Sequence, residues 1–196
     1  MSALLPSETN TLIFQIVLTL WILSEILGTV IIPRIRRRGT VVERKDRGSG
    51  LIIFVTIIIS LALGSYYATH NIAPLPSWFF YPGIVLMILG IVLRQWSMAI
   101  LGRFFSGSVA TQKGQFVVKK GPYKYVRHPS YTGALIILIG LGLASTSWAA
   151  VLSLVLLFCI AYGYRIHVEE KALIADLGEN YVEYKKHTKR LIPYII

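Results

Sequence analysis

The sequence of 196 residues has a single cysteine and few acidic residues. One thiol, Cys159, excludes an intrachain disulfide and a zinc site built from several cysteines. From its place in an apolar segment we expect Cys159 to be a small core residue, and we predict no metal site. Nine Asp and Glu stand against 20 Lys and Arg, a net charge of +11. The cations lie at the ends of apolar runs, so membrane lipid is a better predicted partner than nucleic acid.

Long polar stretches are also scarce, and 55% of the residues are hydrophobic. Five apolar runs are predicted to cross a membrane as helices, at about 12–32, 51–68, 79–101, 130–144 and 148–165. The first has 21 residues and spans about 31 Å at 1.5 Å per residue, and we expect it to end at Pro33. The fourth is short, so it must recruit Pro129 and Ser130 or stop short of the far interface.

No strand alternation or internal repeat is visible, which predicts an all-α, polytopic membrane protein without a Rossmann domain. We expect one domain, 1–196, whose cytosolic part comprises 102–130 and 165–196. Apolar residues recur at helical spacing after Arg165 and predict an amphipathic helix along the cytosolic face. Gly140 and Gly142 have no strand before them, so they indicate close helix packing rather than a dinucleotide-binding loop.

The distribution of the cations predicts the orientation. If the five spans alternate, all 20 Lys and Arg fall on one side of the membrane. The positive-inside rule then places the N-terminus outside and the C-terminus in the cytosol. This would be the cell membrane of a prokaryote or the endoplasmic reticulum of a eukaryote. We expect the first segment to be a retained anchor, because it lacks a basic region and a clear cleavage site.

The segment from Gly121 to Gly133 packs tyrosines, prolines, a histidine and two cations between apolar runs. Pro129 suits the first turn of the helix that follows, so His128 stands at the mouth of that helix. A juxtamembrane loop that contacts lipid would explain the cations and tyrosines, but it does not need the histidine and the hydroxyls.

A second polar cluster begins at Arg165. Ser145–Ser147 is a short link between two spans, and a tight hairpin forces its two ends together. Arg165 and Glu169 are four residues apart on one helix face, which also fits a plain salt bridge. For Glu25 we expect a polar partner within the bundle, although an intramembrane carboxylate is also a functional candidate. We expect Arg94 to extend to the interface, or to lie at the floor of a pocket.

Val126–Gly133, preceded by Gly121-Pro122-Tyr123, resembles the motif of the isoprenylcysteine carboxyl methyltransferase family. The likeness continues through Arg165–Glu170 and Leu177–Tyr184 to Ile192-Pro193. It covers about the last hundred residues in order and spacing.

This resemblance implies S-adenosylmethionine as the methyl donor. Glu169 would bind its polar end, Arg165 would hold the acceptor carboxylate, and these two are the implied catalytic residues. The rest of the cofactor site would be formed by Gln115, Phe116, Val117, Val118, Tyr123, His128, Pro129, Ser130 and Tyr131. The chain departs from the family at Gln115, where related sequences often carry histidine.

The implied reaction is methyl esterification of the carboxylate of a prenylated, lipid-like cysteine at the membrane. No obligate protein partner is evident. Related phospholipid or amine methyltransferases share a similar C-terminal half, and an amine acceptor would need a base such as His128. A sterol-type reductase that uses NADPH and a non-enzymatic bundle that binds phospholipid remain alternatives.

Overall fold

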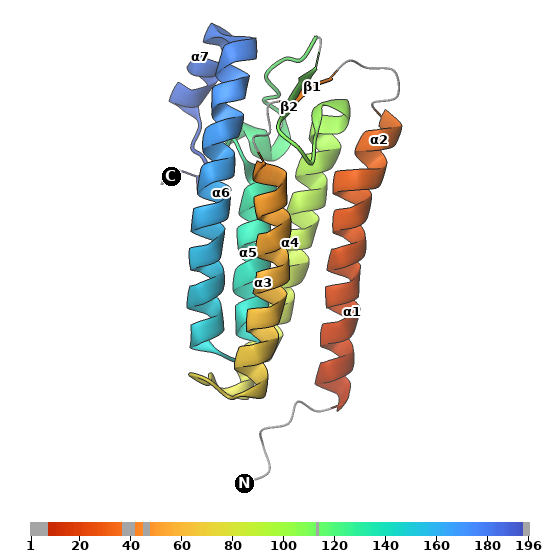
Figure 1. Ribbon diagram of the computed structural model, residues 1–196, viewed down its shortest axis with the longest axis vertical. Helices are drawn as coiled ribbons and strands as arrows, with labels where there is room; N and C mark the ends of the chain where they lie inside the picture. Colours follow the sequence, from red (N-terminus) through yellow and green to blue (C-terminus); the bar gives the residue numbers. More distant parts are fainter. Residues whose placement is uncertain (1–7, 37–41, 45–47, 113, 194–196) are drawn as a thin grey trace.

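The computed structural model describes residues 8–36, 42–44, 48–112 and 114–193. The long helices pack side by side with their axes aligned, and the short elements lie mainly at one end of this bundle (Figure 1). The elements, in order, are α1 (Glu8–Glu25), π-helix η1 (Ile26–Ile31), α2 (Ile32–Arg36), β1 (Val42–Arg44), α3 (Ser49–Thr69), η2 (Ser77–Phe79), α4 (Phe80–Leu101), η3 (Gly102–Phe104), β2 (Ala110–Gln112), η4 (Gly121–Lys124), α5 (Pro129–Ala144), α6 (Trp148–Leu177) and α7 (Glu179–His187).

Four of the described helices are long and apolar enough to cross a membrane. They are Glu8–Ile35, Ser49–Thr69, Ser77–Phe104 and Trp148–Leu177, and Pro129–Ala144 is a shorter apolar helix. Large apolar side chains are exposed on the outer faces, including Leu20, Phe54, Leu89 and Leu156. This is the pattern of an integral membrane protein, and the predicted all-helical membrane fold is confirmed. The fourth of the five predicted spans is the shorter helix α5, which does begin at Pro129.

Two predicted helix ends were wrong. The first helix does not stop at Pro33, but continues as α2 to Arg36. The π-helix before it shifts the hydrogen-bond register, because the N–H of Ile32 donates to Leu27 O, five residues back. Proline lacks the backbone N–H that donates to the residue four positions back. It is tolerated here because the π-helix has already interrupted this regular pattern of hydrogen bonds.

The last long helix also differs from the prediction of a span and a separate amphipathic helix. Helix α6 runs unbroken from Trp148 to Leu177, and it ends at Gly178, whose φ of +54° favours glycine. Arg165 therefore lies inside a continuous helix, which fixes its orientation toward α5.

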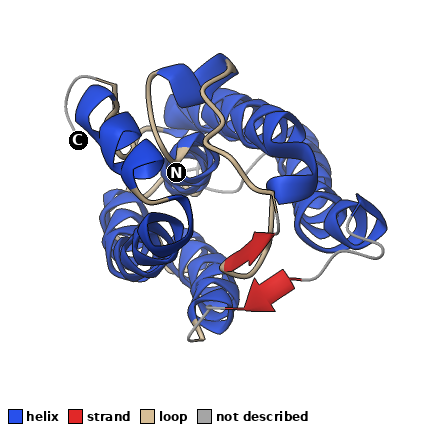
Figure 2. Cartoon of the chain, turned by 90° about the horizontal axis from the view of Figure 1, so that it is seen from above, coloured by secondary structure: helices blue, strands red, loops and turns tan. Residues whose placement is uncertain are grey.

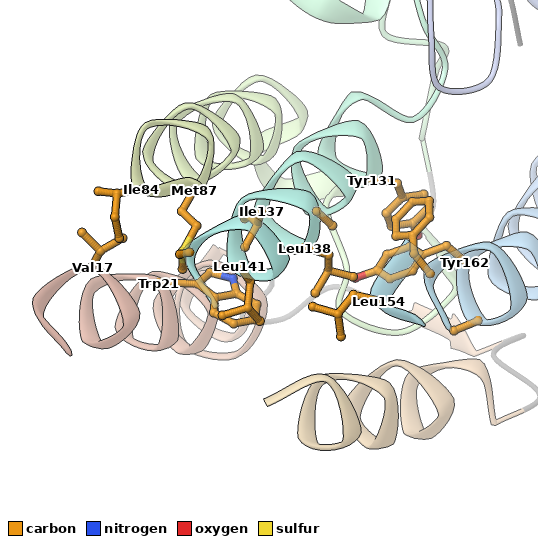
Figure 3. Packing of buried hydrophobic residues seen from close by; sticks show 14 of the residues in the cluster. Val17, Trp21, Ile84, Met87, Tyr131, Ile137, Leu138, Leu141, Leu154 and Tyr162 are labelled. Carbon is orange, nitrogen blue, oxygen red and sulfur yellow. The ribbon is translucent and has the colours of Figure 1, made fainter. Parts of the chain in front are cut away.

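Helices α4 and α5 approach closely along a line of glycines. A Cβ at Gly140 would lie 2.6 Å from Gly83 O, and one at Gly90 would lie 2.7 Å from Gly133 O. Gly142 faces α6, where a Cβ would lie 2.7 Å from Val151 Cα. The role in helix packing predicted for Gly140 and Gly142 is confirmed. Figure 3 shows the core that α5 forms with α1, α4 and α6, with Met87, Ile137 and Leu154 fully buried.

The polar end carries a strand pair that the sequence did not reveal. Strands β1 and β2 pair in antiparallel register, with Glu43 opposite Thr111 (red in Figure 2). Each has only three residues, too few for an alternating pattern to be recognised. The pair joins the connector after α2 to the connector after α4, and α7 lies at the same end of the bundle (Figure 1).

Candidate functional site

The α5–α6 hairpin brings the two polar clusters of the sequence together. Its short link contacts the α3–α4 turn, since Leu75 N donates to Thr146 O at 2.8 Å and Trp148 N to Ala73 O at 3.0 Å. At the other end of the hairpin, the first turn of α5 faces the second half of α6. Tyr131 of α5 meets Arg165 and Glu169 of α6 there.

The Tyr131 hydroxyl lies between Arg165 and Glu169. It accepts a hydrogen bond from Arg165 Nε at 3.0 Å and donates one to Glu169 Oε2 at 2.5 Å. The guanidinium and the carboxylate share one helix face, as predicted, but they are linked through this phenol. A plain helix-end salt bridge therefore does not describe the pair.

Arg165 also fastens two other segments to α6. Its Nη1 donates to Ser49 Oγ at 3.0 Å, at the start of α3, and its Nη2 donates to Gly107 O at 2.8 Å. The residue is only 4% exposed. Arg165 thus combines a place in the site with a structural role, the contacts to Ser49 and Gly107, which the sequence did not indicate.

His128 stands between two carboxylates. Its Nδ1 lies 3.8 Å from Glu169 Oε2 and its Nε2 lies 3.5 Å from Glu170 Oε1. The ring stacks on Tyr131 with an interplanar angle of 11°. The buried Nε2 has no hydrogen-bond partner among the described atoms.

Glu170 is the anchor of the C-terminal segment, a role that the sequence analysis missed. Arg127 Nε donates to Glu170 Oε1 at 2.9 Å, and Lys185 Nζ lies 3.0 Å from Oε2. Arg190 Nη2 lies 3.7 Å from the same oxygen. The two adjacent carboxylates therefore have different partners. Glu169 accepts a hydrogen bond from Tyr131, and Glu170 binds the three cations. The feature of the sequence that could have indicated this role of Glu170 is the scarcity of acidic residues among so many cations.

The C-terminal segment is hydrogen-bonded to the stretch that precedes α5. Arg127 N donates to Lys189 O at 2.7 Å, and His128 N donates to Arg190 O at 3.0 Å. The Thr132 hydroxyl donates to Leu191 O at 2.7 Å. These contacts hold the backbone of His128 in a non-helical conformation, with φ −124° and ψ 56°, just before the helix.

Below α7 lies a cavity of about 90 Å³, which we call the polar cavity. It is lined by Leu101, Phe104, Phe105, Ser106, Ser108, Val109, Gln115, Phe116, Val117, Val118, Tyr123, Arg127, His128, Ser130, Tyr131, Arg165, Glu169, Ala172, Leu173, Leu177, Tyr181 and Tyr184. Every predicted site residue is among them except Pro129, which is fully buried at the start of α5. The Glu169 side chain is 29% exposed.

Three buried phenols form part of this wall. Burial raises the pKa of Tyr123 and of Tyr181, and it raises the pKa of Tyr184 to about 12. The Tyr184 hydroxyl donates to Tyr123 O at 2.6 Å. All three phenols stay protonated at neutral pH, so they add no negative charge to that of Glu169.

A second cavity, of about 720 Å³, lies between the first helix and α3, and we call it the lipid-level cavity. Its walls are formed by Trp21, Ile22, Glu25, Ile26, Thr29, Val30, Pro33, Arg34, Gly50, Ile53, Phe54, Ile57, Ile58, Leu61, Arg94, Phe105, Ser106, Gly107, Ser108, Tyr131, Tyr162 and Arg165. The residues that line both cavities are Phe105, Ser106, Ser108, Tyr131 and Arg165. The two cavities therefore share a wall that includes the Arg165–Tyr131 contact.

One wall of the lipid-level cavity contains an ion pair. Arg94 Nη2 donates to Glu25 Oε2 at 2.8 Å, and both side chains lie within the apolar helices. The polar partner expected for Glu25 is thus present. Arg94 does not extend to the interface, because Glu25 satisfies its charge inside the bundle.

Comparison with known proteins shows that part of the chain is similar to one family. The profile of the isoprenylcysteine carboxyl methyltransferase (ICMT) family matches residues 83–175. The protein-S-isoprenylcysteine O-methyltransferase of Saccharomyces cerevisiae is 36% identical over 58% of this chain and 48% of its own length. The enzyme of the same name from Schizosaccharomyces pombe is 34% identical over 56% of this chain and 47% of its length.

The chain spans less than half the length of these curated relatives. A solved structure of a eukaryotic intramembrane Ras methyltransferase, ICMT, superposes with a TM-score of 0.61 at 24% identity. The superposition covers 73% of the present chain and 52% of the solved chain, and it supports the fold. These matches agree with the family resemblance found in the sequence: residues 83–175, which include Tyr131, Arg165 and Glu169, are similar to the isoprenylcysteine carboxyl methyltransferase family.

Proposed function

We propose that this protein is a membrane methyltransferase that uses S-adenosylmethionine to esterify the carboxylate of a prenylated cysteine. The observation that carries the proposal is the meeting of two different cavities at one arginine. The polar cavity has the chemistry for a charged cofactor, and the lipid-level cavity has the chemistry for an apolar tail. Arg165 and Tyr131 lie where the reacting groups would have to meet.

The residues of the polar cavity fit S-adenosylmethionine. Glu169 offers a partly exposed carboxylate to an ammonium group, while Phe104 and Phe116 offer aromatic faces to a purine ring. When bound, this cofactor supplies an electrophilic methyl group on a sulfonium. A cavity of about 90 Å³ is smaller than the roughly 300 Å³ of a typical ligand site, so binding must widen it. Phe116, 61% exposed and outside the helices, is the wall residue best able to move.

The lipid-level cavity fits a prenyl chain. Its walls on α3 are apolar from Ile53 to Leu61, and it lies at the level of the membrane spans. Arg165 closes its polar end. The guanidinium donates to oxygens of Tyr131, Ser49 and Gly107. A substrate carboxylate would accept charge-assisted hydrogen bonds from the same planar group.

In this arrangement the protein contributes mainly by positioning. A carboxylate is already ionised at neutral pH, so its methylation needs no general base. Transfer from a sulfonium to a carboxylate neutralises both charges, which a dry site favours over the separated ions. Arg165 orients the acceptor oxygen, and Tyr131 fixes the guanidinium relative to Glu169. Alignment of this kind is worth orders of magnitude in rate.

We also propose that the polar end faces the cytosol. In the described part of the chain, α7 and the strand pair lie at the end opposite the start of α1 (Figure 1). The cation-rich connectors belong to that end, as the positive-inside rule requires for the cytosolic side.

Cofactor and acceptor assays on the purified protein test the proposal. We expect S-adenosylhomocysteine to bind, NADPH not to bind, and N-acetyl-S-farnesylcysteine to be methylated on its carboxylate. Methylation of phosphatidylethanolamine instead would favour an amine acceptor, with His128 as the candidate base. Binding of NADPH alone would favour a reductase, and binding of neither ligand would exclude both enzyme classes.

A further inference from the structure

Glu25 and Arg94 form a buried ion pair at the level of the membrane spans. Arg94 Nε donates to Glu25 Oε1, and Nη2 donates to Glu25 Oε2 at 2.8 Å. The Glu25 side chain is 15% exposed and the Arg94 side chain is 7% exposed. Charged groups inside membrane segments are rare because their desolvation is unfavourable, and where they occur they are functional candidates by default.

Arg94 makes a third contact that an ion pair does not need. Its Nη1 donates to Ser130 O at 2.9 Å, in the first turn of α5. Ser130 precedes Tyr131, whose hydroxyl lies between Arg165 and Glu169. One guanidinium therefore connects α1, α4 and the turn that presents Tyr131. The planar fork of arginine presents separate N–H groups to Glu25 and Ser130 in a fixed geometry, which the single nitrogen of lysine does not.

This contact links the walls of the two cavities. Glu25 and Arg94 line the lipid-level cavity, Ser130 lines the polar cavity, and Tyr131 lines both. Glu25 lies outside the residues that match the family, 83–175, whereas Arg94 lies within them. Its position nevertheless makes the placement of Tyr131 depend on the first helix.

The first helix is fastened to α4 at this level. Gln95 Nε2 donates to Ser24 O at 3.1 Å, next to the ion pair. Glu25 is the residue at which α1 passes into the π-helix η1, and the Thr29 hydroxyl donates to its carbonyl at 2.6 Å. Short π-helical segments occur often at functional sites. Here the segment begins at the residue whose carboxylate holds Arg94.

We propose that Glu25 and Arg94 are positioning residues that hold the first turn of α5, and with it the Tyr131 hydroxyl, at the junction of the two cavities. The effect on rate rests on the proposed function, whereas the effect on the α5 turn does not. A buried ion pair that served stability alone could be replaced by apolar residues with little loss. A pair that positions Ser130 cannot be replaced in this way.

The test uses the double variant Glu25→Leu/Arg94→Leu and the single variant Arg94→Lys in purified full-length protein. The first removes both charges, and the second keeps the charge but loses the fork. Glu183→Gln is the matched control, because Glu183 belongs to an exposed ion pair of α7. Thermal stability, steady-state kinetics with N-acetyl-S-farnesylcysteine and hydrogen–deuterium exchange at α5 are measured for each.

We expect both test variants to stay folded and to lose kcat by on the order of 10- to 100-fold, as a misplaced reacting group does. KM should change less than kcat, because Arg165 and the apolar α3 wall of the lipid-level cavity remain. The amides of Tyr131 and Thr132, which both donate to His128 O, should exchange faster than in the wild type. Glu183→Gln should change none of these quantities.

Wild-type kcat together with wild-type exchange in a folded variant would overturn the proposal. If the double variant does not fold, Arg94→Lys decides by the same two readouts. If the wild type methylates no prenylcysteine, the proposed function fails, and exchange at Tyr131 alone decides whether the pair positions the turn.

Discussion

Removal of one hydroxyl, in Tyr131→Phe, should separate the two halves of the site. The ring is retained, with its stacking on His128 at 5.4 Å and its edge contact with Tyr162 at 5.2 Å. The change deletes the hydrogen bond from Arg165 Nε and the one to Glu169 Oε2. Hydrogen bonds to charged groups contribute about 1.5–3 kcal/mol each, and two that share an atom are not additive.

We therefore expect a loss of about 2–3 kcal/mol in transition-state stabilisation, which is roughly a 30- to 150-fold drop in kcat/KM. The affinity for S-adenosylhomocysteine should fall much less, because Glu169 keeps its charge. Steady-state kinetics and calorimetric titration measure the two effects. Tyr125→Phe is the control, since Tyr125 is 51% exposed and does not line the polar cavity. A folded Tyr131→Phe variant with wild-type kcat/KM would refute the reasoning.

Three further predictions concern the cofactor, the packing and the topology. Glu169→Gln should weaken S-adenosylhomocysteine binding by about tenfold or more, because an amide replaces a charge-assisted acceptor; unchanged affinity would leave Glu169 only a structural role. Gly140→Ala should lower the free energy of unfolding by about 1–3 kcal/mol, since its Cβ would lie 2.6 Å from Gly83 O. Gly163→Ala is the control: it has open space around it and should be neutral or stabilising. Equal stability of the two variants would contradict close α4–α5 packing. In a cysteine-free background, thiols at Glu8→Cys and Lys186→Cys should label from opposite sides of the membrane, and labelling from one side would contradict the orientation.

The sequence predicted the parts of the structure that local patterns determine. Apolar length predicted the spans, and the Ser145–Ser147 link predicted that the polar stretch before α5 would meet Arg165 and Glu169. Pro129 correctly marked the beginning of α5, since its fixed φ suits the first turn of a helix.

Contacts between distant residues could not be predicted in this way. Glu25 and Arg94 are 69 positions apart, and no local pattern selects one partner for a buried carboxylate. The place of Tyr131 between Arg165 and Glu169 depends on the rotation of α5 against α6, which the glycine contacts of α5 set. The π-helix before Pro33 was missed because it depends on the hydrogen-bond register rather than on composition.

The central claim is that Arg165 holds the acceptor where the two cavities meet, and Arg165→Lys tests it most directly. Lysine keeps the charge but cannot present two parallel donors to a carboxylate. We expect kcat/KM for N-acetyl-S-farnesylcysteine to fall on the order of 100-fold, while affinity for S-adenosylhomocysteine changes little. Because Arg165 also donates to Ser49 Oγ, Ser49→Ala is the control for this structural contact. Equal kcat/KM for wild type and a folded Arg165→Lys variant would contradict the account.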